Sequence, residues 1–201
     1  MIGKRIIDKD LIDKLDDLKL SLSMFILYLG TDGNINNVPA NSNTWFLPDY
    51  DIEEMFRLAD TGEVDGLNWF LVRLLQDKKS MMLLVDFPFK DSKYWRENKE
   101  RLIEVYIRKL ECVIPDISRH IVFKEAATPD TLYKWTLNHR GASYGWASTT
   151  TQFAIPGLSQ VAPVKDLYLT GHWSTLVQGI TGVAYLGRDT ARIVLNRGNK
   201  K

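Results

Sequence analysis

Residues 20–30, Leu-Ser-Leu-Ser-Met-Phe-Ile-Leu-Tyr-Leu-Gly, decide the fold of this chain. Apolar and small polar residues alternate at the start, and a continuous apolar run follows, which predicts a strand that begins half exposed and ends buried. Residues 80–87, Ser-Met-Met-Leu-Leu-Val-Asp-Phe, predict another strand, which Pro88 ends. A further strand is expected at residues 43–47, whereas residues 67–75 fit either a helix or a strand.

Helices are expected between and after these strands. Apolar residues at helical spacing predict a helix over residues 93–113, with Ser92 placed to cap its amino end. Thr128 followed by Pro129 marks another helix start, because proline is favoured at the first helical position. A last helix is predicted over residues 180–195. Strands and helices mixed with long connections indicate an α+β fold, with a mixed or antiparallel sheet and flanking helices.

The composition is that of an ordinary globular protein. The chain has 201 residues, of which 45% are apolar and 25% charged, enough for one domain and a piece of another. A net charge of +1 gives no reason to expect a nucleic-acid partner. The single cysteine, Cys112, favours a reducing compartment such as the cytoplasm. No apolar run is long enough to span a membrane, while peripheral membrane contact stays open.

Self-contained catalytic motifs are absent from the sequence. There is no Gly-x-Gly-x-x-Gly, no phosphate-binding Gly-x-x-x-x-Gly-Lys and no Gly-x-Ser-x-Gly. His120, His139 and His172 lie far apart in the sequence and give no zinc-ligand spacing with the single cysteine. Each histidine is better explained as a structural or surface residue, and the sequence names no catalytic residue and no metal ligand.

The C-terminal region carries the one segment suited to a ligand. Residues 166–171, Asp-Leu-Tyr-Leu-Thr-Gly, predict a short buried strand that closes on glycine, followed by a loop and the last helix. Glycines 179 and 182 open that helix and permit close approach of the backbone to a ligand. The free N–H groups of the first turn suit an anion. The alternative is that Gly179 and Gly182 merely allow tight helix packing, and spacing alone does not separate the two.

Three segments together resemble the phytoene desaturase family, which includes carotenoid isomerases and retinol saturases. The most specific is residues 167–183, Leu-Tyr-Leu-Thr-Gly-His-Trp-Ser-Thr-Leu-Val-Gln-Gly-Ile-Thr-Gly-Val, similar to the family's C-terminal flavin-binding signature. Residues 127–132, Ala-Thr-Pro-Asp-Thr-Leu, and 141–146, Gly-Ala-Ser-Tyr-Gly-Trp, resemble the stretch that precedes it. Residues 20–30 resemble a strand of the family's substrate domain.

The resemblance implies a division into two domains. Enzymes of this family build a flavin domain from both ends of the chain, with a substrate domain between. Residues 1–140 are therefore expected to form part of a substrate-binding domain, and residues 141–201 the C-terminal strand-helix piece of a Rossmann-like FAD-binding domain. The family's Gly-x-Gly-x-x-Gly lies in an N-terminal half that this sequence lacks. That half would be the main partner of the chain.

The resemblance also implies FAD as cofactor and a set of residues that contact it. Residues 176–179, Leu-Val-Gln-Gly, depart from the Pro-Gly-Gly-Gly-like run of many members, which indicates a carotenoid-isomerase-like or separate branch. Tyr144 and Trp146 are expected to line the substrate pocket, with core packing as the alternative. The expected FAD contacts are Gly171, Gly179, Ile180, Thr181, Gly182 and Val183.

The implied function is that of a flavin-dependent oxidoreductase. Its substrate would be an apolar polyene or isoprenoid, such as a carotenoid or retinoid that is desaturated, saturated or isomerised. The chain alone is expected to be inactive and to bind FAD weakly or not at all, because most phosphate contacts lie in the absent half. Two alternatives stay open: a non-enzymatic lipid- or isoprenoid-binding module, and a fragment of an amine-oxidase-type flavoenzyme, whose C-terminal flavin signature is related.

Overall fold

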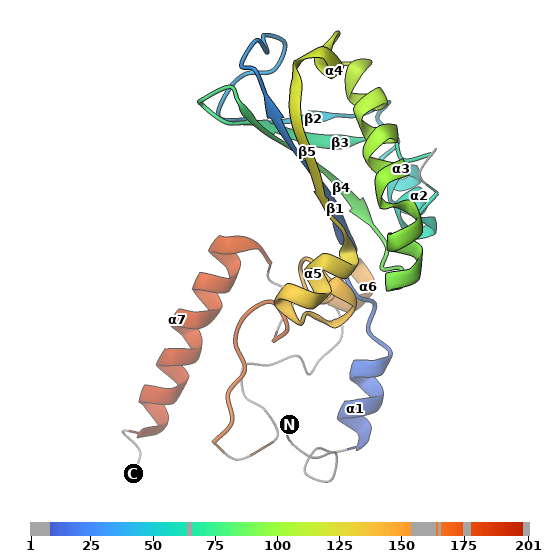
Figure 1. The fold of residues 1–201 in the computed structure, drawn as a ribbon. Coiled ribbons are helices and arrows are strands. Elements are labelled where there is room, and N and C mark those ends of the chain that lie inside the picture. Colours follow the sequence, from blue (N-terminus) through green and yellow to red (C-terminus); the bar gives the residue numbers. More distant parts are fainter. Residues whose placement is uncertain (1–8, 64–65, 154–163, 165, 175–177, 199–201) are drawn as a thin grey trace. The chain divides into compact units, whose positions relative to one another are not determined.

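The computed structural model describes residues 9–63, 66–153, 164, 166–174 and 178–198 (Figure 1). It divides into two compact units. We call Leu22–Ser143 the sheet unit, and we call Met1–Ser21 together with Tyr144–Lys201 the C-terminal unit. Each unit is described by itself.

A five-stranded sheet forms the centre of the sheet unit, in the order β2-β3-β4-β1-β5. All four ladders between neighbouring strands are antiparallel, so the predicted α+β fold is confirmed and the mixed-sheet option is not realised. The ambiguous residues 67–75 contain a strand, β3. The strands are β1 (Ser23–Thr31), β2 (Ser42–Phe46), β3 (Phe70–Leu74), β4 (Ser80–Phe87) and β5 (Ile121–Ala127).

One long helix, α3 (Ser92–Glu111), provides most of the core on one face of the sheet (Figure 1). Phe25 of β1 stacks on two of its side chains, with ring centroids 6.3 Å from Trp95 and 5.6 Å from Tyr106. Phe87 of β4 meets Trp95 edge to face at 5.3 Å. Buried aromatic pairs of this kind add directional stabilisation to the hydrophobic burial.

The central strand β1 alternates between buried and partly exposed residues along its whole length. Phe25, Leu27 and Leu29 are buried on the α3 side, whereas Met24 and Ile26 are half-buried on the other side. The expectation that this strand becomes buried on both faces at its end is therefore wrong. Side chains of a strand point alternately to the two faces, and α3 covers one of them.

The other helices differ in length. Helix α2 follows β2, and Asp51 caps it by accepting a hydrogen bond from the backbone N–H of Glu54 at 3.0 Å. The predicted last helix is present as α7. The bounds are α1 (Lys9–Asp16), α2 (Ile52–Thr61), α4 (Ile117–His120), α5 (Pro129–Thr136), the 3-10 helix η1 (His139–Gly141), α6 (Thr150–Phe153) and α7 (Gly179–Gly198).

The predicted start of α5 is confirmed in detail. Thr128 is its N-cap, and Pro129 is its first residue. The backbone N–H of Thr131 donates to Thr128 Oγ1 at 3.2 Å, and Thr131 Oγ1 accepts from the backbone N–H of Thr128 at 3.1 Å. This reciprocal pair satisfies two backbone donors at the helix end.

The predicted cap of α3 is wrong by one residue. Asp91, not Ser92, is the N-cap, and its carboxylate accepts a hydrogen bond from the backbone N–H of Tyr94 at 2.8 Å. The hydroxyl of Ser92 instead donates to Asp130 Oδ1 at 2.7 Å. Asp91 has the extended backbone that an N-cap requires, and Ser92 already lies in the first turn.

The compact units differ from the predicted domain division at the amino end of the chain. Residues 1–21 belong with the C-terminal unit rather than with the sheet unit. The backbone N–H of Ala147 donates to the carbonyl of Lys19, and the backbone N–H of Ser21 donates to that of Gly145, both at 2.8 Å. The buried Gln152 side chain also donates to the Lys19 carbonyl, at 3.2 Å. These long-range hydrogen bonds join the two segments.

Replacing Asp91 tests the corrected cap of α3. Asp91→Ala should lower the free energy of unfolding by about 1 kcal/mol, because the Tyr94 N–H loses its acceptor. Asp91→Asn keeps a side-chain oxygen in place and should cost much less. Chemical denaturation of both variants measures the difference, and equal losses would contradict the assignment.

Candidate functional site

The loop that follows Gly171 is a tight turn held by Ser174. The backbone N–H and the hydroxyl of Ser174 both donate to the Gly171 carbonyl, at 3.1 and 2.8 Å, and Ser174 is buried. Gly171 has a φ of +87°, in the left-handed region that favours glycine. The turn therefore fixes the backbone of residues 171–174 at the position where the sequence predicts the cofactor loop.

The backbone of this turn packs closely against Gly145. A β-carbon at Gly145 would lie 2.5 Å from the carbonyl oxygen of His172, and the φ of Gly145 is +76°. A residue other than glycine would therefore clash with the loop and strain its own backbone. This close approach explains the second glycine of the motif at residues 141–146.

Trp146 anchors the same loop. Its ring meets that of Trp173 edge to face, with centroids 5.0 Å apart, and its Nε1 donates to the Trp173 carbonyl at 3.1 Å. The Trp146 carbonyl accepts from the side-chain amide of Gln178 at 2.5 Å. These are packing contacts of Trp146 with the loop, and its predicted place in a substrate pocket stays a prediction. Tyr144, the other predicted pocket residue, is exposed.

The amino end of α7 is open among the described residues. Gly179 has a φ of +75°, and a β-carbon there would meet no atom within 4 Å. Ile180 is 90% exposed and Thr181 is exposed, while Gly182 and Val183 are half-buried. Tight packing therefore does not explain Gly179, whereas its left-handed backbone does. The first turn presents N–H groups that lack partners within the helix.

Residues 167–170 do not form the predicted buried strand. Tyr168 makes an isolated β-bridge, no continuous strand is assigned to the segment, and Leu169 is 41% exposed. A strand needs a neighbour to pair with along its length, and no described strand pairs continuously with this segment. Residues 175–177, which hold most of the departure from the family motif, lie outside the described residues.

His172 is a polar residue of this region that the sequence analysis did not assign to the site. Its Nε2 atom is buried and has no hydrogen-bond partner among the described residues. Burial lowers the pKa of its imidazole, which favours the neutral ring with one donor and one acceptor nitrogen. Its position directly after Gly171 was the available signal.

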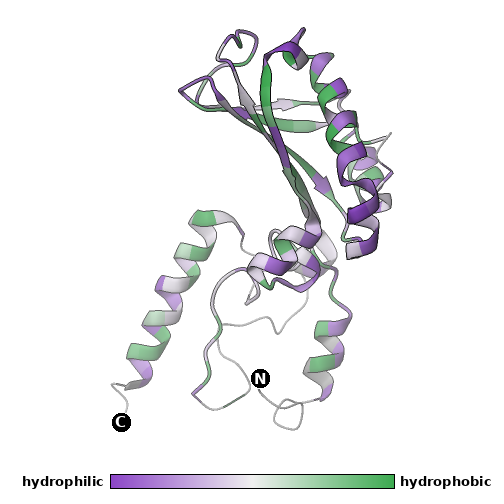
Figure 2. Cartoon of the chain, viewed as in Figure 1, coloured by the Kyte–Doolittle hydropathy of each residue, from purple (hydrophilic) through white to green (hydrophobic). Residues whose placement is uncertain are grey.

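The described part of the C-terminal unit has few buried apolar side chains. Among its described residues, Leu18 and Leu186 are the large apolar side chains that are buried. Helix α7 has hydrophobic residues along its length (Figure 2), and several of them are exposed. The exposed ones are Ile180, Tyr185, Val194 and Leu195.

An apolar band crosses the second face of the sheet. Antiparallel partners share a face, and the register pairs Trp45 with Leu71, Leu71 with Leu84, Leu84 with Ile26 and Ile26 with Ala127. These five residues, one from each strand, form the band. Trp45 is 57% exposed, and the other four are half-buried.

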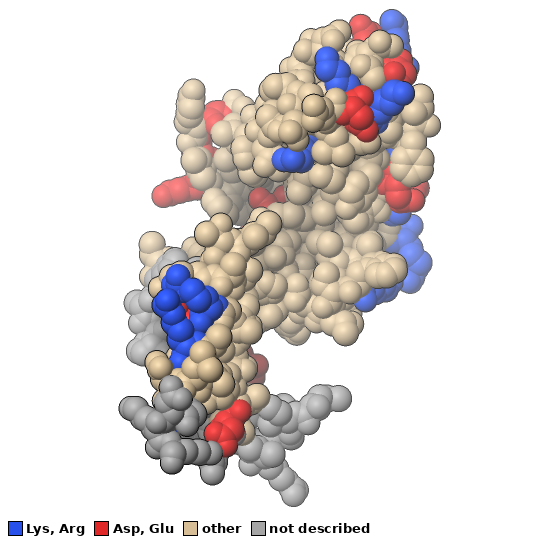
Figure 3. All heavy atoms as spheres, turned by 90° about the vertical axis from the view of Figure 1, so that its left-hand side faces the viewer, with Lys and Arg blue, Asp and Glu red and all other residues tan. Residues whose placement is uncertain are grey.

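The surface around the band carries few charges. Figure 3 views the sheet unit from the side away from α3 and shows a largely uncharged surface at its centre, with charged side chains at its upper end and along both edges. In the next row across the sheet, Arg73 pairs with Met82, Met82 with Tyr28, and Tyr28 with Glu125. The two charged residues of this row thus stand on strands β3 and β5, with Met82 and Tyr28 between them.

No protein-family model matches the chain, and no curated protein matches it. In the described part, no helix is both long and apolar enough to cross a lipid bilayer. No group of three His, Cys, Asp or Glu side chains in that part is placed to hold a metal ion.

Gly145→Ala tests whether the loop depends on close backbone approach. The added methyl group should displace residues 171–174 and lower the free energy of unfolding by about 2 kcal/mol or more. Gly187→Ala is the matched control, because a β-carbon at Gly187 meets nothing and alanine is the better helix former. Thermal unfolding and near-ultraviolet circular dichroism report the change, and a Gly145→Ala protein as stable as wild type would contradict the packing described.

Proposed function

We propose that this chain is the C-terminal part of a flavin-dependent oxidoreductase that acts on an apolar polyene or isoprenoid. The observation that carries the substrate class is the apolar band, which crosses all five strands on the face that α3 leaves free. A long hydrocarbon gains about 25 cal/mol for each Å² of its surface removed from water. The band would hold such a molecule by burial and would exclude water from it.

The cofactor assignment follows from the loop at Gly171 and the first turn of α7. The described residues fit a ring-bearing anion, because two left-handed glycines, an open helix end and the unpartnered Nε2 of His172 occur in one short segment. N–H groups of residues 179–182 and the positive end of the helix dipole would favour negative charge. When bound, FAD supplies the transfer of a hydride or an electron pair.

The proposed enzyme includes a second half that completes the C-terminal unit. Few of the described apolar side chains of this unit are buried, and α7 exposes Tyr185, Val194 and Leu195. Such surfaces are commonly covered by further protein. We infer that the N-terminal half of the enzyme covers α7 and supplies the Gly-x-Gly-x-x-Gly and most phosphate contacts. The chain alone is then inactive.

A lipid- or isoprenoid-binding module without catalysis is the second candidate. It shares the apolar band with the first proposal and does not use the open end of α7. Ligand binding at the band and flavin retention at α7 therefore separate the two functions, and each has its own experiment.

The apolar band is tested by titration with all-trans-retinol, an apolar polyene whose fluorescence reports binding. Leu84→Gln should weaken binding about tenfold, because a buried leucine contributes roughly 1.5–3 kcal/mol. Val122→Gln is the control, since Val122 is exposed on β5 outside the band. Equal affinity of wild type and Leu84→Gln would remove the band from the proposal.

The cofactor assignment is tested in the protein that includes the coding sequence upstream of Met1. It should purify with a bound yellow flavin, and Gly182→Leu should lose most of it because the larger side chain blocks the first turn of α7. Gly187→Leu, placed further along the helix, should retain it. A colourless, folded protein, or full retention in Gly182→Leu, would contradict the flavin site while leaving the lipid-binding candidate.

A further inference from the structure

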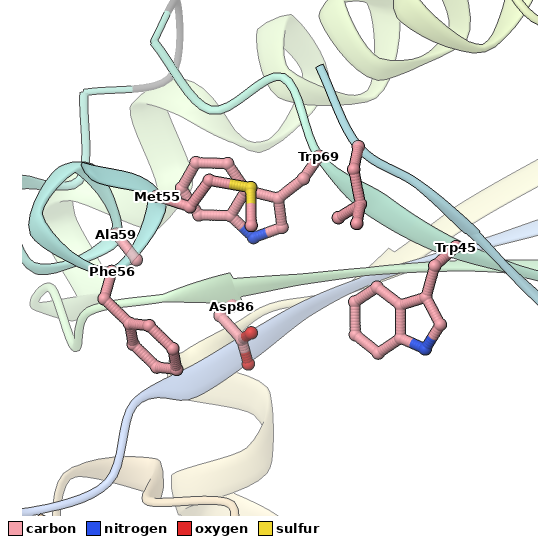
Figure 4. A pocket seen from close by; sticks show the side chains of 7 residues that line it. Trp45, Met55, Phe56, Ala59, Trp69 and Asp86 are labelled. Carbon is pink, nitrogen blue, oxygen red and sulfur yellow. The ribbon is translucent and has the colours of Figure 1, made fainter. Parts of the chain in front are cut away.

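A small pocket lies within the sheet unit, between α2 and the ends of strands β2, β3 and β4 (Figure 4). Its volume is about 150 Å³, and its walls are apolar and aromatic apart from one carboxylate. A cavity of about this size holds a molecule as large as benzene. The lining residues are Trp45, Leu47, Met55, Phe56, Ala59, Trp69 and Asp86.

The carboxylate of Asp86 points into the space between Phe56 and Trp45 (Figure 4). Asp86 pairs with Met24 across the β1–β4 ladder, so it lies on the sheet face away from α3. Trp69 and Met55 are buried at the back of the pocket, while Trp45 and Phe56 are exposed at its mouth. The anionic group thus lies between the rings of Phe56 and Trp45, and Trp69 also lines the pocket.

Asp86 has no counter-charge in the described part of the chain. No described residue forms an ion pair or a hydrogen bond with it, in contrast to Asp32, Glu54, Asp77 and Asp130. Burial raises the pKa of the Asp86 carboxyl above its ordinary value, and no nearby positive charge counters that effect. A half-buried carboxylate without a partner is costly to the free protein and becomes favourable once a cation binds.

We propose that this pocket binds a small organic cation, an alkylated ammonium group, between the carboxylate of Asp86 and the rings of Trp45, Phe56 and Trp69. Aromatic faces attract cations, tryptophan most strongly, and rings that surround a site recognise alkylated ammonium groups. The carboxylate adds the opposite charge. The apolar walls suit the methyl groups that such a cation carries.

The walls offer little to a bare metal ion. Calcium takes six to eight oxygen ligands, and magnesium keeps several waters around it, whereas this pocket offers one carboxylate among apolar and aromatic side chains. A neutral apolar molecule would fill the space but would leave Asp86 without a partner. The alkylated ammonium group is the chemistry that satisfies both the rings and the charge.

This site is separate from the flavin proposal. Its residues belong to the sheet unit, and Trp45 is shared with the apolar band. A ligand that lies on the apolar band could therefore place an alkylated ammonium group in this pocket. Its test uses the chain alone and is independent of flavin retention.

Calorimetric titration with choline and with 3,3-dimethylbutan-1-ol tests the proposal. The two molecules have nearly the same shape, and a neutral carbon replaces the charged nitrogen in the second. Wild type should bind choline at least about tenfold more tightly than the neutral alcohol, because only choline pairs with the carboxylate. Equal affinities, or no binding of choline, would overturn the proposal.

Three variants localise the site. Asp86→Asn, which keeps the shape and removes the charge, should weaken choline binding at least about tenfold and leave the binding of the alcohol nearly unchanged. Trp45→Leu should weaken choline binding through loss of one ring. Glu97→Gln is the matched control, because it removes an exposed carboxylate on α3. An equal loss in Glu97→Gln would show a general charge effect and overturn the site.

Thermal unfolding without ligand shows whether a variant that binds choline weakly is still folded. Asp86→Asn should have a melting temperature equal to or above that of wild type near neutral pH, because it removes an unpartnered half-buried charge. If Asp86→Asn unfolds instead, Asp86 also supports the fold, and Trp45→Leu then localises the site. The choline and alcohol comparison on wild type stands in either case.

Discussion

The packing of α3 against one face of the sheet is the interaction on which the sheet unit depends. Phe25 stacks on Trp95 and Tyr106, and this aromatic contact decides which residues of β1 point into the core. Because strand side chains alternate, the same contact directs Met24 and Ile26 to the other face. The register of four antiparallel ladders then aligns the apolar residues of that face into a continuous band. The surface available to a ligand is thus a consequence of how the core is packed.

The C-terminal unit depends on a different constraint, the close approach of backbone to backbone. The carbonyl of His172 lies where a β-carbon of Gly145 would stand, and the rings of Trp146 and Trp173 hold the loop against it. These contacts fix a short turn, and few of the unit's described apolar side chains are buried. The exposed residues of α7 are consistent with a unit that is completed by further protein. The flavin proposal explains both features with one partner.

Local patterns in the sequence predicted where helices and strands occur, and they predicted less well which distant residues each element contacts. The strand at residues 80–87 and the cap at Thr128 follow from neighbouring residues, and both are as expected. The cap of α3 differed because Asp91 and Ser92 are both good caps, and the contact of Ser92 with a distant Asp130 is invisible locally. The predicted strand at 167–170 failed because strand formation depends on neighbours that a single segment does not reveal.

The candidate sites were also predicted only where a local sequence pattern marks them. Glycine spacing pointed to residues 171–182, whereas the pocket around Asp86 joins four separated stretches and has no motif. The most direct test of the account is an experimental structure of this chain together with the proposed N-terminal half. It should show density for a ring-bearing cofactor against the first turn of α7. Density for ordinary side chains packed over residues 179–182, with no cofactor beside them, would contradict it.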